Sequence, residues 1–247
     1  MSIFRQISQK TEQGKKQYWI LLDPDDFSGG ELKKLVETAQ EIGVSAILVG
    51  GSLVHCENIE NFIAEIKKNC NLPVILFPGD AAQVAKNADA ILFMSLISGR
   101  NPDFLIGQQV KGAVQIAQSK VEPISMGYML VESGTTTSVE FMSNTRPLPC
   151  DKPNIAAAHA LAAQFLGMSM LYLEAGSGAK NPVPDKIIAA VKKSVKIPVI
   201  VGGGIRDAET AKQKFAAGAD ILVTGNMLAK ENGLEVMKEI ADLANGF

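Results

Sequence analysis

Residues 198–226 read PVIVGGGIRDAETAKQKFAAGADILVTGN, and this stretch decides the fold. Two apolar runs, 199–201 and 221–224, each end in glycine, and a segment with helical spacing lies between them. Consecutive glycines accept positive φ and let backbone N–H groups point together at an anion. In an eight-stranded α/β barrel, glycine turns after the last two strands form the usual phosphate site. The alternative, that the glycines only shape tight turns, explains a single turn better than a pair. We therefore predict that the chain binds phosphate here.

The composition is that of an ordinary globular chain. With 247 residues, 47% of them hydrophobic and 20% charged, the chain is long enough for one large barrel or two small domains. A formal charge of -2 and a pI near 5.8 argue against nucleic-acid binding, which normally needs a basic face. The three cysteines lack CxxC spacing, so no zinc-type structural site is expected. With no signal peptide and no apolar run long enough to span a bilayer, we expect a cytoplasmic protein without a membrane span.

Strands and helices are expected to alternate along the whole chain. Before the opening stretch, apolar runs predict strands at 18–22, 44–49, 73–77, 90–94, 123–130 and 170–174. Amphipathic spacing predicts helices at 2–12, 29–42, 59–68, 81–86, 102–117, 155–166, 185–194 and 231–243. Alternation without a linker-like break predicts an α/β fold, a single (β/α)8 TIM barrel domain over residues 1–247, with a short N-terminal helix under its floor. A doubly wound sheet is the competing fold, and the paired glycine turns favour the barrel.

The segment 131–152 interrupts this alternation. It is rich in Ser, Thr, Gly and Pro, and its pattern predicts irregular structure. Loops of this length are normally functional covers or mobile segments. We therefore expect a mobile loop over the active site.

Barrel enzymes place their reacting groups at the carboxyl ends of the strands, and several polar residues occupy such positions. Asp23 follows the first apolar run and Ser52 follows the second. Oxygen ligands beside a phosphate site suit Mg2+, which takes one or two protein oxygens plus substrate phosphates; the alternative is that Asp23 caps a turn. Glu174 ends an otherwise uncharged run, so desolvation is expected to raise its pKa and make it a general base. The alternative is that Glu174 hydrogen-bonds the backbone of its own glycine loop. Tyr172, two residues earlier, points to the same side of the strand as Glu174 and can hydrogen-bond the substrate.

Apolar residues follow the fourth and fifth strands, where a sugar phosphate would not need them. Flexible hydrocarbon ligands suit a methionine-rich lining. Such a groove could be lined by Met94, Leu96, Ile97, Met126, Tyr128 and Met129. Core packing is the commoner use of these residue types. No strand ends in a lysine able to form a Schiff base, which counts against a class I aldolase.

With these motifs assembled, the chain resembles the geranylgeranylglyceryl phosphate synthases and their heptaprenyl relatives. The likeness extends from Leu22-Asp23-Pro24 to the end of the chain, and it rests on Tyr172-Leu173-Glu174-Ala175-Gly176-Ser177-Gly178, Val201-Gly202-Gly203-Gly204-Ile205-Arg206 and Thr224-Gly225-Asn226. The resemblance implies a prenyltransferase that joins the 3-hydroxyl of sn-glycerol 1-phosphate to a polyprenyl diphosphate and releases diphosphate, in ether-lipid biosynthesis. Geranylgeranyl diphosphate is the favoured donor and heptaprenyl diphosphate the alternative. A homo-oligomer is also implied.

The resemblance assigns a role to each set of residues. Asp23 and Ser52 correspond to Mg2+ ligands that hold the leaving diphosphate, and Glu174 corresponds to the base. The glycerol phosphate pocket would be formed by Tyr172, Leu173, Glu174, Ala175, Gly176, Ser177, Gly178, Gly203, Gly204, Gly225 and Asn226. Three alternatives would use the same phosphate clamp: a phosphosugar isomerase or lyase, an FMN-binding oxidoreductase, and a non-catalytic module that binds phosphorylated metabolites.

Overall fold

The computed structural model describes residues 2–51 and 58–247, and it folds as a closed barrel of parallel strands. In chain order the strands are β1 (Gln17–Leu22), β2 (Ala46–Val49), β3 (Val74–Leu76), β4 (Ala90–Leu96), β5 (Glu122–Leu130), β6 (Met170–Glu174), β7 (Val199–Gly202) and β8 (Ile221–Thr224). Each strand pairs with the next, and β1 closes the ring on β8 with Gln17 opposite Ile221. The predicted (β/α)8 barrel is therefore confirmed. A doubly wound sheet is excluded because it would leave two open edges.

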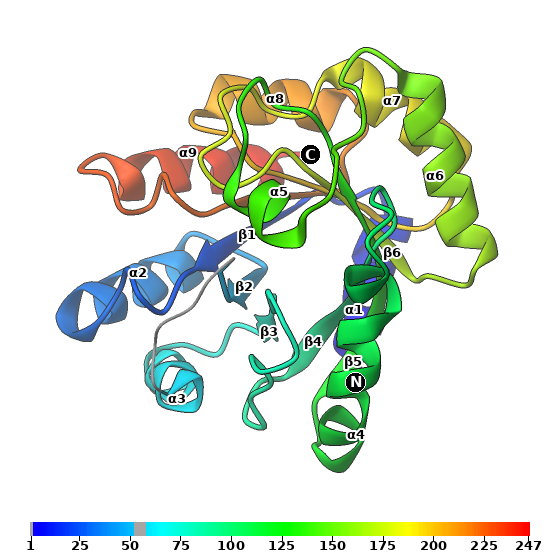
Figure 1. The fold of residues 1–247 in the computed structure, drawn as a ribbon. Helices are drawn as coiled ribbons and strands as arrows, with labels where there is room; N and C mark the ends of the chain where they lie inside the picture. Colours follow the sequence, from blue (N-terminus) through cyan, green and yellow to red (C-terminus); the bar gives the residue numbers. More distant parts are fainter. Residues whose placement is uncertain (1, 52–57) are drawn as a thin grey trace.

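Helices ring the barrel, as Figure 1 shows. Those that follow strands are α2 (Gly29–Glu41), α3 (Ile59–Asn69), α4 (Gln108–Gln118), α6 (Pro153–Phe165), α7 (Asp185–Ser194), α8 (Ala208–Ala216) and α9 (Gly233–Asn245). A π-helix, η1 (Asp103–Gly107), leads into α4, and α5 (Ser138–Ser143) lies inside the ring in Figure 1. Within the described ranges, none of the helices combines the length and the apolar character needed to cross a bilayer.

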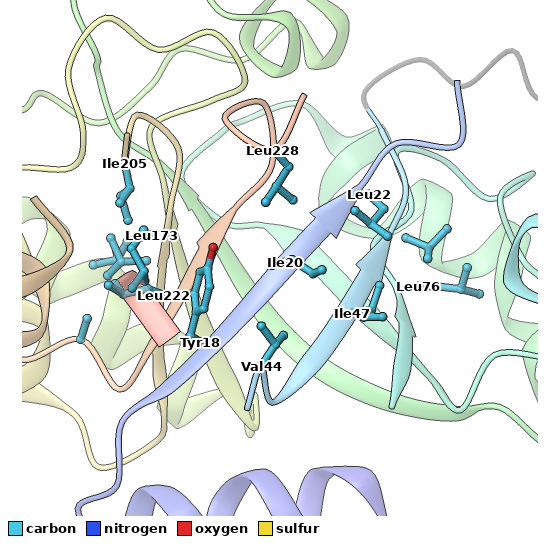
Figure 2. Close-up of a cluster of buried hydrophobic side chains, with 14 of the residues drawn as sticks. Tyr18, Ile20, Leu22, Val44, Ile47, Leu76, Leu173, Ile205, Leu222 and Leu228 are labelled. Carbon is cyan, nitrogen blue, oxygen red and sulfur yellow. The ribbon is translucent and has the colours of Figure 1, made fainter. Parts of the chain in front are cut away.

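Two layers of apolar side chains hold the barrel together. Trp19 and Leu48 point inward and are fully buried in the interior layer. Tyr18, Ile20 and Ile47 alternate with them and point outward, into the layer between strands and helices that Figure 2 shows. Because both faces of the strands are buried, their sequences read as continuous apolar runs rather than as an apolar-polar alternation.

The N-terminal helix α1 (Ile3–Glu12) closes the end of the barrel where the strands begin. Glu122, the first residue of β5, accepts hydrogen bonds from the backbone N–H groups of Ile3 at 2.6 Å and Phe4 at 3.1 Å. Ile3, Phe4 and Ile7 pack against the interior layer. The helix lies under the floor as predicted, so a ligand site is left for the opposite end, where the strands terminate.

The connection from β3 to β4 differs from the prediction. The predicted helix at 81–86 is wrong, because residues 77–89 form turns and no helix. The side chains of Gln83 and Asp80 accept hydrogen bonds from the backbone N–H groups of Gly79 at 2.9 Å and Ala82 at 2.8 Å. Side-chain bonds of this kind compete with a helix for the backbone donors. The ring consequently has no helix between β3 and β4, a stretch that the structure describes in full.

The segment 131–152, predicted to be irregular, contains the short helix α5. Asn144 ends this helix in the left-handed conformation, with a φ of 48°. An isolated β-bridge between Val131 and Leu148 joins the start of the segment to a residue near its end. The prediction of irregular structure is therefore wrong for α5, and the mobility of the segment stays a prediction.

Candidate active site

One large pocket opens where the barrel strands end. It has a volume of about 1160 Å³, and residues that follow β1, β3, β4, β6, β7 and β8 line it together with part of segment 131–152. Gly176, Gly203 and Asn226 lie on one side of the pocket, and apolar side chains from β4 and α4 lie on the other. Because α1 fills the opposite end of the barrel, this pocket is the candidate active site.

The first side of the pocket is formed by three loops that we call the glycine rim. The rim consists of residues 176–178, 203–204 and 225–226, which follow β6, β7 and β8. Gly176, Gly178, Gly203 and Gly204 have φ values of 101°, 75°, 79° and 71°, which side chains rarely adopt. A Cβ on Gly203 would also overlap the Glu174 carboxylate. Glycine therefore brings the backbone close to the pocket, where its N–H groups can face an anion.

Side chains tie the three loops of the glycine rim to one another. Ser177 Oγ donates to Asn226 Oδ1 at 3.1 Å, which joins the loop after β6 to the loop after β8. Arg206 Nη2 donates to the Ala179 carbonyl at 2.7 Å, which joins the loop after β7 to the loop after β6. The rim is thus one connected surface rather than three separate turns.

Glu174 ends β6 beside the glycine rim and is only 6% exposed. Its Oε1 accepts the N–H of Gly176 at 2.6 Å, and the hydroxyls of Tyr172 and Tyr128 donate to the same carboxylate. Burial raises the pKa of Glu174 from 4.5 to about 7 and outweighs these hydrogen bonds, which lower it. A carboxylate with this pKa can accept a proton near neutral pH.

Aromatic rings join Glu174 to the second side of the pocket. Burial, and then the charge of Glu174, raise the pKa values of Tyr128 and Tyr172 well above 10, so both phenols remain donors. Phe77 stacks on Tyr172 with ring centroids 5.2 Å apart, and the Tyr128 ring lies 5.5 Å from Tyr172. The three rings form a continuous wall that leads away from the carboxylate.

The second side of the pocket is an apolar groove between β4 and α4. The apolar groove is lined by Phe77, Val84, Ile91, Phe93, Met94, Leu96, Phe104, Gly112 and Ile116. At Gly112 an added Cβ would be 3.7 Å from Ile116 and 3.8 Å from Ala81, so a larger side chain there would narrow the groove. The connection 77–89, which forms no helix, supplies Phe77 and Val84 to this lining. Such a lining suits a flexible hydrocarbon chain.

Acidic and basic side chains in the pocket wall follow different strands. The carboxylates after β1, β3 and β4 are Asp23, Asp26, Asp80 and Asp103, and the cations after β7 and β8 are Arg206 and Lys230. An anion on the glycine rim therefore lies near Arg206 and Lys230. An anion near β1 instead meets carboxylates, and binding there requires a divalent cation between the two.

Asp23 fits such a cation. It lines the pocket at the end of β1, and its Oδ1 also accepts the N–H of Asp25 at 3.1 Å, so it both caps a turn and faces the pocket. Ser52, the second predicted ligand, lies outside the described residues. Among the residues that are described, no cluster of three or more His, Cys, Asp or Glu could hold a metal by itself. A hard cation would depend on Asp23 and on ligand oxygens, a sparse arrangement that Mg2+ accepts.

Segment 131–152 lies over the pocket. Its lining residues are Thr136, Thr137, Ser138, Val139, Phe141, Met142 and Ser143. The Asn181 N–H donates to the Ser133 carbonyl at 3.0 Å, and Asn101 Nδ2 donates to the Ser143 carbonyl at 2.7 Å. These bonds tie the segment to the loops after β6 and β4, which places it where a cover is needed.

Most of the site residues predicted from the sequence come together in the pocket. Those that line it are Asp23, Tyr172, Glu174, Gly176, Ser177, Gly178, Gly203, Gly204, Gly225 and Asn226. The side chains of Leu173 and Ala175 are buried in the outer core layer, so these residues can serve a ligand only through their backbone. In the groove, Met94, Leu96 and Tyr128 line the pocket as predicted. Met126 and Met129 pack in the core instead.

Several pocket residues were not predicted from the sequence. Lys230 is a cation soon after the eighth strand, and its position alone could have identified it. Thr137, Phe104 and Gly112 come from segments whose path over the barrel is not visible in the sequence pattern. Residues at strand ends can therefore be predicted from the sequence, whereas those that reach the pocket from other segments cannot.

Comparison with known proteins gives consistent matches over nearly the whole chain. Residues 10–244 match the PcrB family. The chain is 46% identical over 242 residues to the geranylgeranylglyceryl phosphate synthase of Pyrococcus horikoshii. This alignment covers 97% of this chain and 94% of that protein. It is 42% identical over 240 residues to the protein of the same name from Chitinophaga pinensis, again with 97% and 94% covered.

A solved structure matches the fold closely. It is the (S)-3-O-geranylgeranylglyceryl phosphate synthase from Thermoplasma acidophilum in complex with its substrate sn-glycerol-1-phosphate, and the TM-score is 0.94. The two sequences are 34% identical, and the match covers 100% of both chains. The similarity therefore extends over the pocket as well as the barrel.

Proposed function

The chain belongs to the PcrB family, and from this premise we propose that it joins the 3-hydroxyl of sn-glycerol 1-phosphate to a polyprenyl diphosphate, with geranylgeranyl diphosphate as the favoured donor. The reaction forms an ether bond and releases diphosphate, as ether-lipid biosynthesis requires. The names of the relatives and the glycerol phosphate bound by the Thermoplasma acidophilum protein support this reaction.

The placement of Glu174 is the observation that carries the proposal. Its buried carboxylate, with a pKa raised to about 7, shares one pocket with the glycine rim and the apolar groove. The rim suits a phosphate and the groove suits a hydrocarbon chain, so the two substrates would meet at this carboxylate. A phosphosugar isomerase would use the rim and would have no need of the groove.

The chemistry follows from this placement. Glu174 takes the proton of the acceptor's 3-hydroxyl as that oxygen attacks the allylic carbon of the donor. The bond from this carbon to the diphosphate oxygen breaks, and its electron pair leaves with the diphosphate. Hydrogen bonds from Tyr128 and Tyr172 hold the carboxylate in place. Segment 131–152 would keep water away from the positively charged carbon, which water would otherwise trap.

We also propose that Mg2+ takes part, held by Asp23 and by diphosphate oxygens, with Ser52 as the second predicted ligand. When bound, Mg2+ supplies positive charge that stabilises the leaving diphosphate. The carboxylates that follow β1 support this role, because without a cation they would repel the donor.

The Mg2+ proposal is tested by substituting Asp23→Asn. The amide keeps the acceptor for the Asp25 N–H and removes the charge, so we expect Mg2+-dependent transfer to fall roughly 100-fold or more. A Mg2+ titration of transfer measures this. Asp25→Asn is the matched control, since Asp25 is not among the pocket-lining residues and its backbone N–H, which donates to Asp23, is unchanged by the substitution. Unchanged Mg2+ dependence in Asp23→Asn would place the cation elsewhere.

The activity itself is tested by transfer of radiolabelled sn-glycerol 1-phosphate into an organic phase, with prenyl diphosphates of increasing length. We expect transfer with geranylgeranyl diphosphate and little with sn-glycerol 3-phosphate as the acceptor. A maximum at heptaprenyl diphosphate would change the donor and keep the reaction. No transfer with any donor would contradict the proposed function.

Oligomeric state and location stay predictions from the sequence: a homo-oligomer and a cytoplasmic protein. One surface supports the first. Ile106, Val110 and Val114 lie at helical spacing on η1 and α4 and are 60%, 65% and 65% exposed. Exposed apolar patches of this kind commonly lie in interfaces. Light scattering on the purified protein would measure the mass in solution and show whether it exceeds the monomer's 26.3 kDa.

A further inference from the structure

Thr137 carries a buried hydroxyl in the wall of the pocket, and no described residue bonds it. The residue is 4% exposed and lines the pocket beside Gly176. A buried hydroxyl without a partner is costly, and buried polar groups in folded proteins are nearly always paired. A group of this kind in a pocket wall therefore points to a ligand.

The orientation of Thr137 strengthens this reading. Thr137 precedes α5 at the N-cap position, where threonine normally accepts a hydrogen bond from the first turn of the helix. Its side chain makes no such bond. The side chain packs instead against the loop after β6, because a Cβ added to Gly176 would be 2.5 Å from each of Thr137 Cβ, Cγ2 and Oγ1. The hydroxyl is thus placed beside the glycine rim rather than at its own helix.

The surroundings of Thr137 identify the substrate it faces. The Gly176 N–H donates to Glu174 Oε1 at 2.6 Å, so Thr137 packs on the residue that bonds the proposed base. The bonds of Ser133 to Asn181 and of Ser143 to Asn101 hold the segment on either side of it. Thr137 is therefore held next to the acceptor end of the pocket.

Building on the proposed function, we propose that Thr137 is a further acceptor-binding residue, whose Oγ1 hydrogen-bonds an oxygen of bound glycerol phosphate. A hydroxyl can donate to a phosphate oxygen or exchange a bond with a glycerol hydroxyl. Either bond supplies the partner that the side chain lacks.

The test compares Thr137→Val, which removes the hydroxyl and keeps the shape, with Thr137→Ser, which keeps the hydroxyl. Calorimetric titration with sn-glycerol 1-phosphate alone should show binding about 10- to 100-fold weaker in Thr137→Val. Thr137→Ser should bind nearly as well as the wild-type chain. The KM for the prenyl diphosphate should not change. The melting temperature of unliganded Thr137→Val should be equal or higher, because no cap bond is lost.

The matched control is Thr135→Val, a substitution on the same segment at an exposed residue that is not among those lining the pocket. Equal binding by Thr137→Val and the wild-type chain would overturn the proposal and leave an ordered water as the hydroxyl's partner. Weaker binding that comes with an equal loss of unliganded stability would also overturn it, because the role would then be structural. If the wild-type chain itself did not bind sn-glycerol 1-phosphate, the proposed function would fail first, and this proposal with it.

Discussion

The glycine rim and the apolar groove share one pocket but are built in different ways. The rim is made of backbone, and the positive φ values of Gly176, Gly178, Gly203 and Gly204 set its shape. The groove is made of side chains from β4, η1, α4 and the helix-free connection 77–89. A backbone site tolerates few substitutions, whereas one side chain can alter the length of a groove. The acceptor site is therefore expected to be rigid and the donor site adjustable.

The largest effect is expected where the two sides meet, at Glu174. In Glu174→Gln the side chain can still accept the Gly176 N–H, but it cannot take a proton. We expect the rate of transfer to fall about 10²- to 10⁴-fold, while the affinity for sn-glycerol 1-phosphate stays close to that of the wild-type chain. Single-turnover transfer and calorimetry measure the two quantities. Transfer at the wild-type rate would show that Glu174 is not the base.

The next largest effect is expected for Gly203→Ala, which should weaken acceptor binding at the rim without affecting donor binding in the groove. The added methyl group would overlap the Glu174 carboxylate at a φ of 79°. We expect the affinity for sn-glycerol 1-phosphate to fall roughly 10- to 100-fold and the KM for the donor to stay unchanged. Gly14→Ala is the matched control for backbone strain, because Gly14 has a φ of 74° and nothing within 4 Å of an added Cβ. If Gly203→Ala bound sn-glycerol 1-phosphate as tightly as the wild-type chain, the expected contrast between a rigid rim and an adjustable groove would be wrong.

The pH dependence of transfer tests the raised pKa of Glu174. A base must be deprotonated to act, and the pKa of this carboxyl is about 7. Because this pKa is that of the unliganded protein, kcat/KM should fall about tenfold for each pH unit below it and level off above it. The residual activity of Glu174→Gln should not follow this curve. A wild-type profile that stays level from pH 8 down to pH 5 would mean that burial does not raise this pKa.

The smallest effect is expected in the apolar groove, in Gly112→Phe, which tests whether the groove ends at this residue. The ring would occupy the space beside Ala81 and Ile116. We expect kcat/KM to fall about fivefold more for heptaprenyl than for geranylgeranyl diphosphate, with no change in acceptor affinity. Ala113→Phe adds the same ring at an exposed position of α4 that lies outside both the pocket lining and the patch of Ile106, Val110 and Val114, and it serves as the control. Equal losses for both donors would show that the groove does not end at Gly112.

The two sides also differ in how far the sequence reveals them. The glycine rim is local, because each turn directly follows an apolar strand, and the position of Glu174 at the end of such a run was enough to predict its burial. The groove depends on contacts between distant segments, such as Val84 and Ile116, which no periodicity records. The sequence also predicts a helix at 81–86, where the structure has only turns. The sequence shows helical spacing there but not the competing side-chain bonds of Asp80 and Gln83.

Segment 131–152 illustrates the same limit of prediction from the sequence. Its composition marked segment 131–152 as unusual, yet the contact between Thr137 and Gly176 joins two segments that only the fold brings together. Asp23 falls between these cases. Its place after β1 was readable from the sequence, whereas its bond to the Asp25 N–H and the uneven charge around the pocket were not.

A crystal structure of the chain with bound sn-glycerol 1-phosphate tests the account most directly. We predict the phosphate on the backbone N–H groups of the glycine rim and the 3-hydroxyl within hydrogen-bond distance of Glu174. A phosphate bound instead beside the carboxylates that follow β1, with the 3-hydroxyl far from Glu174, would contradict both the acceptor site and the base.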